Sequence, residues 1–400
     1  MNKGVYQCVL LVLFFSGMVA CSDRSKQTVP FECMLEGEVK GWSECSSLAL
    51  IEAEKREEAV PVVSIPVVGG KFEYTFRDSV NRLYQLYGKF DEGNRRRRVE
   101  FISEKGKLFV ELSRDEEELI SQIRTDLPFN KELQLVADSS IAVKLFTKRK
   151  QMKADGLYYL SEEYKELSEA AKQLEGEIFF SQNPERERLF EYVRTHPTFT
   201  GFCLYKWLLL KNIGPFLSFP SDPNIPVLKE IYETVYKEKY TDHPYQKEIK
   251  DMLGSLDVKE GASFVDFVAP DLNGNQYRLS DLIKGKYALL DLWASWCGPC
   301  RSYSKDMKPV YERYKNRGFT VVGVAREVND TEAMRRAIEK DGYPWINLFD
   351  LNDQVGVWTK YGVLSAGRRL LINPTGKILA LDPQSEEVEK LLEKYLNKTL

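Results

Sequence analysis

The stretch Trp293-Ala294-Ser295-Trp296-Cys297-Gly298-Pro299-Cys300 decides the fold of the C-terminal third of this chain. It follows an apolar run over residues 287–292 and precedes a stretch with helical spacing over residues 301–317. The two cysteines therefore lie at a strand-to-helix junction. The N-terminus of a helix favours negative charge, which lowers the pKa of the first thiol and makes a thiolate available. The stretch predicts a dithiol that can close and reopen as a disulfide.

Strand and helix patterns alternate on both sides of this dithiol. In chain order, the predicted elements are strand 287–293, helix 300–316, strand 319–325, helix 331–340, helical stretch 352–361, strands 370–372 and 377–381, and helix 385–396. A β-α-β unit followed by β-β-α is the order of the thioredoxin fold, and the connection between its parallel strands is expected to be right-handed.

Residues 261–400 resemble the TlpA/ResA-like branch of the thioredoxin superfamily, which reaches into the redoxin group. Besides Trp-Cys-Gly-Pro-Cys, the resemblance rests on segments 269–274 (Ala-Pro-Asp-Leu-Asn-Gly), 279–282 (Leu-Ser-Asp-Leu), 285–286 (Gly-Lys), 318–324 (Gly-Phe-Thr-Val-Val-Gly-Val) and 373–378 (Asn-Pro-Thr-Gly-Lys-Ile). It implies a thioredoxin fold and thiol–disulfide oxidoreductase activity. The remaining chain resembles Bacteroidota envelope lipoproteins that place an uncharacterised β-rich domain and a helical segment before such a domain, with residues 100–107 carrying this second match.

The dithiol and the resemblance together suggest three catalytic residues. Cys297, at the start of the helix, is the expected attacking thiol, and Cys300, one turn further, resolves the mixed disulfide. Asp291 lies six positions before Cys297, at the offset of the buried acid of thioredoxins. Burial would raise the pKa of this carboxyl and suit it to proton transfer. The alternative is a purely structural aspartate at a strand end.

The residues around Cys297 are expected to contact the substrate. Trp296 would cover Cys297 and offer a flat apolar surface, whereas Trp293 would pack beneath the site. Gly298 and Pro299 form the dipeptide of reducing thioredoxins, which favours a reductant. A zinc half-site is the alternative for a Cys-x-x-Cys pair, but this domain lacks further cysteines or histidines at matching spacing.

The sequence departs from the family pattern in residues 361–369. Relatives carry a cis-proline in the loop after a Tyr-Gly-Val-like stretch, and Gly367 stands at that place here. A non-proline cis bond costs roughly 3 kcal/mol, so we expect a trans bond and a reshaped loop whose Ala366 and Gly367 contact the substrate. Arg368 and Arg369 either contact an acidic partner or lie in solvent.

The N-terminus has the pattern of a bacterial lipoprotein. Lys3, the apolar run 9–15 and the small residues up to Ala20 predict a signal peptide over residues 1–20 that is too short to span a bilayer. Cys21 follows as in a lipobox, which predicts lipidation of Cys21 and a lipid-anchored linker over residues 21–30. The alternative is ordinary secretion with Cys21 as a free thiol.

The fold class predicted for the 400 residues is multidomain. Short β-prone runs separated by turn signals predict an all-β domain over residues 31–126, as a sheet, sandwich or barrel. Long charged stretches with helical spacing predict a helical segment over residues 127–257, and the α/β thioredoxin fold follows over residues 258–400.

The composition, the other cysteines and the histidines bear on whether the chain has a nucleic-acid partner, a second disulfide or a metal site. The net charge of -3 does not indicate a nucleic-acid partner. Cys33 and Cys45, on either side of a predicted hairpin turn at Lys40-Gly41, either pair or are two small buried side chains. Cys203 is predicted in the core. His196 and His243 fit no metal-ligand spacing, so no metal and no cofactor beyond the Cys297–Cys300 disulfide are expected.

The sequence leaves three functions open. The first is a periplasm-facing reductase of the cell envelope that acts on disulfides of exported proteins and is recharged by a membrane electron donor. The second is a peroxiredoxin-like peroxidase, which lacks support because no Pro-x-x-x-Thr-x-x-Cys pattern surrounds Cys297. The third is a non-enzymatic lipoprotein that binds a partner and keeps a thioredoxin-like scaffold.

Overall fold

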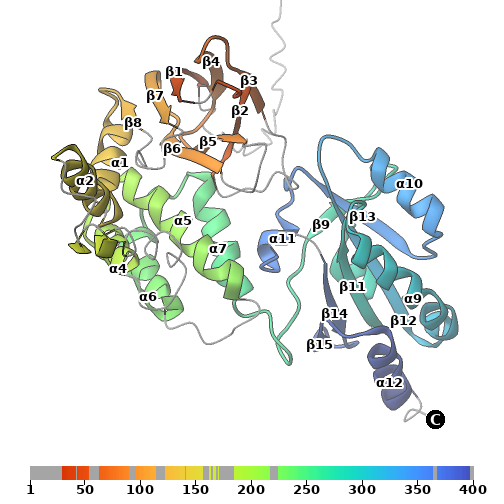
Figure 1. Cartoon of the computed structure of the whole chain (residues 1–400). Coiled ribbons are helices and arrows are strands. Elements are labelled where there is room, and N and C mark those ends of the chain that lie inside the picture. Colours follow the sequence, from red (N-terminus) through yellow and green to blue (C-terminus); the bar gives the residue numbers. More distant parts are fainter. Residues whose placement is uncertain are drawn as a thin grey trace, which may run out of the picture.

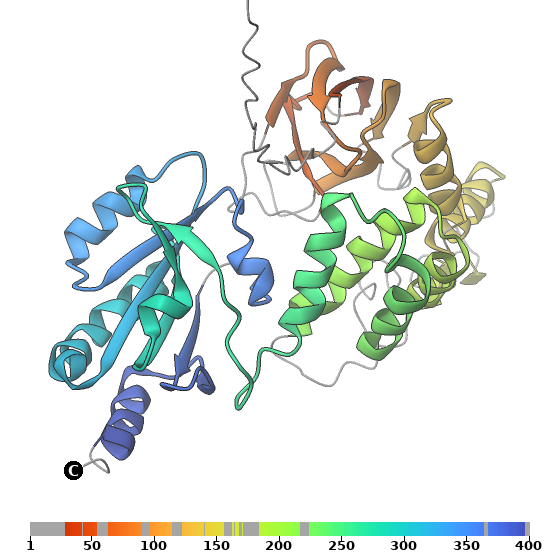
Figure 2. The ribbon, with the colours of Figure 1, turned by 180° about the vertical axis from the view of Figure 1, so that it is seen from behind.

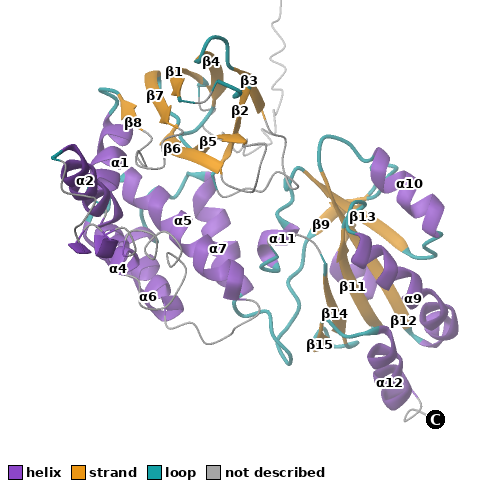
Figure 3. Ribbon diagram, in the orientation of Figure 1, coloured by secondary structure: helices purple, strands orange, loops and turns teal. Residues whose placement is uncertain are grey.

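The computed structural model describes residues 29–41, 43–53, 63–89, 96–113, 122–139, 141–155, 162–163, 165–167, 170, 184–216, 224–363 and 367–396. Strands lead, helices follow, and a mixed α/β domain ends the chain (Figure 3). The predicted signal peptide and Cys21 lie outside the described residues. Among those that are described, no helix is both long and apolar enough to cross a membrane.

The first strands form two four-stranded sheets, with orders β4-β1-β7-β8 and β3-β2-β5-β6. The strands are β1 (Phe31–Lys40), β2 (Ser47–Glu52), β3 (Val63–Pro66), β4 (Lys71–Asp78), β5 (Leu83–Lys89), β6 (Arg96–Ile102), β7 (Gly106–Ser113) and β8 (Gln122–Arg124). The inward side chains of both sheets meet in one apolar core. The sequence had not indicated β8.

The predicted hairpin at Lys40-Gly41 is wrong. β1 pairs with β4 on one side and, in parallel, with β7 on the other, so neither edge of β1 is free for β2. The chain instead crosses to the second sheet, where β2 pairs with β3 and β5. Cys33 and Cys45 are free, buried thiols in the shared core, and Cys203 is buried as predicted.

The helices that follow share a core with the strand region. They are α1 (Pro128–Asp138), α2 (Ile141–Ala154), α4 (Pro184–Thr195), α5 (Phe199–Phe216), α6 (Asn224–Ile231), a π-helical turn (Tyr232–Tyr236) and α7 (Pro244–Ser255). Glu104, just after β6, caps α1 by accepting hydrogen bonds from the N–H groups of Phe129 and Asn130. The Asn130 side chain also bonds both backbone groups of Ile102, at 2.8 and 2.6 Å.

The C-terminal domain has the thioredoxin fold. Its elements are β9 (Val268–Pro270), β10 (Gln276–Arg278), α8 (Leu279–Ile283), β11 (Tyr287–Trp293), α9 (Gly298–Tyr314), a 3-10 turn (Lys315–Arg317), β12 (Phe319–Glu327), α10 (Glu332–Asp341), β13 (Ile346–Leu351), α11 (Val357–Lys360), β14 (Arg368–Ile372), β15 (Ile378–Leu381) and α12 (Ser385–Leu396). The sheet order is β13-β12-β11-β14-β15, with the first three strands parallel. Residues of α9, α10 and α12 form the core on one face, and residues of α8 and α11 form the core on the other.

The thioredoxin domain contacts the preceding helices through α11. This short helix lies on the side of the domain nearest α7 (Figures 1 and 2). The Lys360 ammonium pairs with the Asp251 carboxylate at 2.9 Å, and Lys247 pairs with the same carboxylate at 2.8 Å. Residues 361–363 follow α11, and Gly367 is the next residue that the structure describes.

Candidate active site

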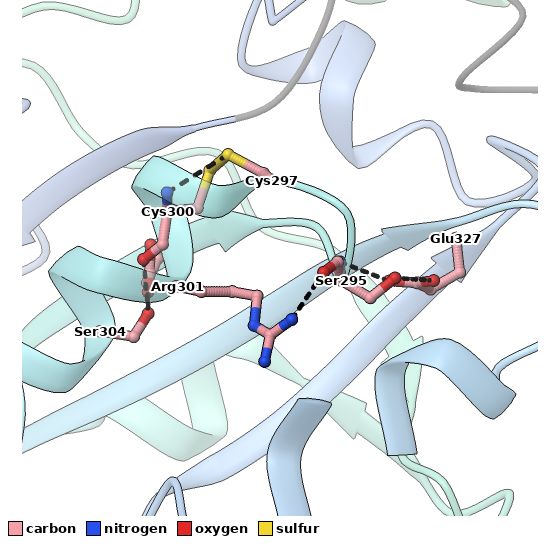
Figure 4. Close-up of a disulfide and its surroundings, with 7 residues drawn as sticks. Ser295, Cys297, Cys300, Arg301, Ser304 and Glu327 are labelled. Carbon is pink, nitrogen blue, oxygen red and sulfur yellow. Dashed lines mark hydrogen bonds between the residues drawn. A yellow bond between two sulfur atoms is a disulfide. The ribbon is translucent and has the colours of Figure 1, made fainter. Parts of the chain in front are cut away.

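The dithiol lies where the central strand β11 passes into α9. Cys297 is the N-cap of α9, Pro299 occupies the first turn, and the Cys297 sulfur accepts a hydrogen bond from the N–H of Cys300 at 3.3 Å. Cys297 and Cys300 form a disulfide with their Cα atoms 5.3 Å apart (Figure 4). The junction therefore places both sulfurs at the positive end of the helix dipole, where a thiolate is favoured.

The two cysteines differ in accessibility. Cys300 is 3% exposed, whereas Cys297 is partly exposed and the flanking Gly298 and Pro299 are exposed. Trp296 keeps 46% of its surface in solvent, although large apolar side chains usually avoid water. An incoming disulfide can reach Cys297 but not Cys300. Contact of Trp296, Gly298 and Pro299 with a substrate stays a prediction.

Asp291 lies on β11 within the apolar core beneath the dithiol. Its carboxylate accepts a hydrogen bond from the Ser304 hydroxyl at 2.7 Å, and Ser304 also lies 3.2 Å from the Cys300 carbonyl. Burial raises the pKa of Asp291 to about 6, although the Ser304 hydrogen bond and the charge of Arg369 act to lower it. Ser304 thus connects the Asp291 carboxylate with the backbone carbonyl of Cys300. A carboxyl with this pKa exchanges protons near neutral pH.

Ser295, two residues before Cys297, is held on both sides by groups that the sequence did not indicate. The Glu327 carboxylate, at the end of β12, accepts hydrogen bonds from the Ser295 N–H at 2.9 Å and the Ser295 hydroxyl at 2.7 Å (Figure 4). The Arg301 guanidinium donates to the Ser295 carbonyl at 3.3 Å. Glu327 is buried, which raises the pKa of its carboxyl against the lowering effect of these two hydrogen bonds.

A second buried carboxylate fixes Arg301. Asp341, at the end of α10, accepts a hydrogen bond from Arg301 Nε at 2.6 Å, and the Lys305 ammonium lies 3.0 Å from its other oxygen. The hydrogen bond from Arg301, joined by Lys305 and Tyr343, holds the pKa of Asp341 at about 2. We call Glu327, Ser295, Arg301 and Asp341 the loop clamp, because together they fix the backbone that carries Trp296 and Cys297.

Gly367 lies against the dithiol, whereas Ala366 lies outside the described residues. The Gly367 N–H donates to the Leu292 carbonyl at 3.1 Å, and a Cβ atom at position 367 would lie 3.1 Å from the Cys300 sulfur. The φ angle of Gly367 is +88°, in the region that favours glycine. Because proline requires a φ near −65° and lacks the N–H, it does not fit this backbone.

A thioredoxin fold with a Cys-x-x-Cys disulfide at the start of the helix after its central strand defines the class of thiol–disulfide oxidoreductases. The model of the AhpC/TSA family matches residues 261–380. The thiol-disulfide oxidoreductase ResA of Bacillus subtilis is 30% identical over 145 residues, which are 36% of this chain and 78% of ResA.

Solved structures from Bacteroides give similar matches. The thioredoxin domain of a thiol-disulfide oxidoreductase from Bacteroides vulgatus is 30% identical and covers 35% of this chain and 99% of that domain, with a TM-score of 0.33. A thiol:disulfide interchange protein from a Bacteroides species is also 30% identical, and its match covers 35% of this chain and 92% of that protein, again with a TM-score of 0.33.

The chain belongs to the TlpA/ResA-like family of thiol–disulfide oxidoreductases, through its C-terminal domain. The resemblance inferred from the Trp-Cys-Gly-Pro-Cys core is thereby confirmed. The relatives also favour an enzyme over a thioredoxin-like scaffold without activity. The family implies disulfide-containing proteins as substrates.

Proposed function

We propose that this protein reduces disulfides of exported proteins through the Cys297–Cys300 dithiol. The observation that carries the proposal is the difference between a reachable Cys297 and a buried Cys300 with a buried carboxyl nearby. A dithiol of this kind engages its substrate with one sulfur and protects the other until it is needed. The Gly298-Pro299 dipeptide supports reduction as the direction.

The reduction runs in two exchange steps. The Cys297 thiolate attacks one sulfur of the substrate disulfide, forms a mixed disulfide and releases the other substrate sulfur as a thiolate, which takes up a proton. The Cys300 thiolate then attacks the Cys297 sulfur, closes the protein disulfide and releases the second substrate thiolate. The substrate gains two electrons and two protons, and the dithiol loses them.

Asp291 serves the second step in this scheme. The Cys300 thiol must lose its proton before it attacks, and Cys300 is too buried to give that proton directly to bulk water. An ionised Asp291 carboxylate accepts the proton, with Ser304 holding the carboxylate in place. A carboxyl with a pKa of about 6 is ionised at neutral pH yet basic enough to take a proton.

The proposal also includes the location of the protein in the cell. The lipobox-like N-terminus supports a protein of the bacterial cell envelope, anchored by lipid on Cys21 and facing the periplasm. A membrane electron donor, itself a dithiol, would return two electrons to the Cys297–Cys300 disulfide. If Cys21→Ser partitions with membranes as the wild type does, the anchor is elsewhere.

Insulin reduction tests the activity. The wild-type protein should reduce insulin with dithiothreitol as the electron source, Cys297→Ser should lose the activity, and Cys300→Ser should trap a mixed disulfide with the substrate. Cys203→Ser is the matched control, since this buried thiol lies in the helical core and should not affect turnover. A Cys297→Ser variant as active as the wild type would overturn the proposal.

Peroxide is the second substrate to measure, because the matching family model is that of AhpC/TSA. Peroxide turnover is measured with the same Cys297→Ser, Cys300→Ser and Cys203→Ser variants. Turnover of hydrogen peroxide that exceeds insulin reduction and depends on Cys297 would favour the peroxidase.

A further inference from the structure

Arg368, the residue after Gly367, is a buried cation for which the described residues provide no ion-pair partner. The residue is 8% exposed, its Nε atom is fully enclosed without a hydrogen-bond partner, and no carboxylate of the described residues forms an ion pair with it. Burying a guanidinium without a counter-charge is costly, and proteins usually pair such a group or place it where a ligand supplies the charge. The expectation that Arg368 could simply lie in solvent is wrong.

Other arginines around the site are accommodated differently. Arg301 pairs with Asp341, and Arg326, on the same face of the sheet as Arg368, lies 3.6 Å from the Asp353 carboxylate. Arg369, the next residue along β14, places its guanidinium 4.0 Å from the centre of the Tyr303 ring. Of these four arginines, Arg368 is the one for which the described residues provide neither a carboxylate nor an aromatic ring as a partner.

The position of Arg368 connects it with substrate binding. It follows Gly367, which lies against the Cys300 sulfur, and its Cα pairs with Leu292, where β11 leads into the dithiol loop. Because side chains alternate along a strand, Arg368 extends to the face opposite Arg369 and α9, with Leu370 and Ile372. That face also holds Tyr361 and Val363, which precede Gly367 by only a few residues in the chain.

We infer that Arg368 binds a carboxylate of the substrate polypeptide, from an aspartate or glutamate close to the cysteine that Cys297 attacks. This inference rests on the proposed function and adds a substrate class to it: disulfides in an acidic context. A guanidinium offers a planar pair of donors that matches a carboxylate, and a buried charge is only weakly screened. The substrate thus supplies the counter-charge that the fold omits.

Single-turnover kinetics can test the inference. The pre-reduced full-length protein is mixed with short peptides that carry one disulfide and a single Glu at each position near the attacked cysteine, with Gln at the same position as the reference. The readout is the ratio of second-order rate constants for each Glu and Gln pair. We expect a ratio of about 10 at the best position, as for a hydrogen bond between charged groups.

Variants separate a binding role from a structural role. Arg368→Gln should bring the ratio to about 1, and Arg368→Lys should restore part of it, because it keeps the charge but loses the planar fork. Arg278→Gln, which removes an exposed positive charge elsewhere in the same domain, should keep the ratio of the wild type. Removing an uncompensated buried charge should also leave the melting temperature of Arg368→Gln unchanged or higher.

The outcomes are distinct. If the wild type reacts equally fast with Glu and Gln peptides, or if Arg368→Gln keeps the preference, the inference is overturned while the reductase function stands. A lower melting temperature of Arg368→Gln without a changed ratio shows a structural role and also overturns it. If the reduced wild type reacts with none of the peptides, the proposed function itself has failed.

Discussion

At the scale of single residues, the buried carboxyl of Asp291 links stability to activity. Its pKa is raised to about 6 by burial, so the folded state holds the proton more tightly than the unfolded chain does. The favourable contribution is complete below the unfolded pKa of about 4 and is lost as pH rises through about 6. We predict that the stability of Asp291→Asn relative to the wild type rises from pH 4 upward, by up to about 3 kcal/mol at pH 7. Denaturant unfolding at pH 4 and pH 7 measures this difference.

The same variant should lose activity. Asparagine can still accept the Ser304 hydrogen bond but cannot take the Cys300 proton, so closure of the protein disulfide should slow by roughly 100-fold. In the wild type this step should accelerate as pH rises through about 6, where Asp291 ionises, and the inflection should be absent from Asp291→Asn. Identical pH profiles of the two proteins would exclude the proton-transfer role.

The residues that could be predicted from sequence share one short segment. Asp291, Cys297 and Cys300 lie within ten positions, on one strand, one loop and one helix start, so local spacing fixes their relation. Glu327 and Asp341 are 32 and 40 positions away from the groups they bind. Their carboxyls come close only because β12 and α10 pack beside β11 and α9, and no local pattern records that packing.

At the scale of elements, the loop between β11 and α9 owes its conformation to the loop clamp. Glu327→Ala leaves the Ser295 N–H and hydroxyl without their acceptors in a buried place, which should cost roughly 3 kcal/mol of stability and reduce kcat/KM by about 10-fold. In Glu327→Gln, the amide oxygen can still accept a hydrogen bond from Ser295, and the amide N–H can donate one to the Ser295 hydroxyl. This variant should retain most of the stability and most of kcat/KM.

The redox potential of the dithiol distinguishes positioning from electrostatics. If Glu327 acts by position, Glu327→Ala shifts the potential and the thiolate pKa of Cys297, and Glu327→Gln restores both. A Glu327→Gln variant with the same loss as Glu327→Ala would show that the negative charge matters, and the clamp interpretation would then be wrong.

Element boundaries followed from the sequence more readily than element neighbours. The predicted strand 287–293 and the predicted helix 385–396 have the bounds of β11 and α12, because an apolar run and helical spacing mark these two elements locally. The partners of β1 could not be inferred, since β4 and β7, which pair with its two edges, lie far along the chain. β8 has only three residues and is too short for a periodic pattern.

At the scale of the whole molecule, the apolar cores separate the chain into two parts, one before Val258 and one from Val258 onward. Ala53, Leu83 and Ile102 of the strand region belong to the same apolar core as the helices α1, α4, α5, α6 and α7. The Tyr245 hydroxyl accepts a hydrogen bond from the N–H of Leu83 at 2.9 Å, which ties α7 to β5. By contrast, both cores of the thioredoxin domain consist only of residues from Val258 onward.

We therefore predict that residues 258–400 fold alone and residues 31–126 do not. The first fragment loses the contact of α11 with α7, whose Lys360–Asp251 ion pair is partly exposed and worth at most about 1 kcal/mol. It should melt cooperatively and reduce insulin at a rate within about 3-fold of that of the full chain.

The second fragment, residues 31–126, exposes Leu83 and Ile102 and removes the helix side of their core. Calorimetry should accordingly give two transitions for the full chain, one of them matching the melting of residues 258–400. A cooperative transition in residues 31–126 alone would show that the strand region is an independent domain, because the core that it shares with the helices would then not be required for folding.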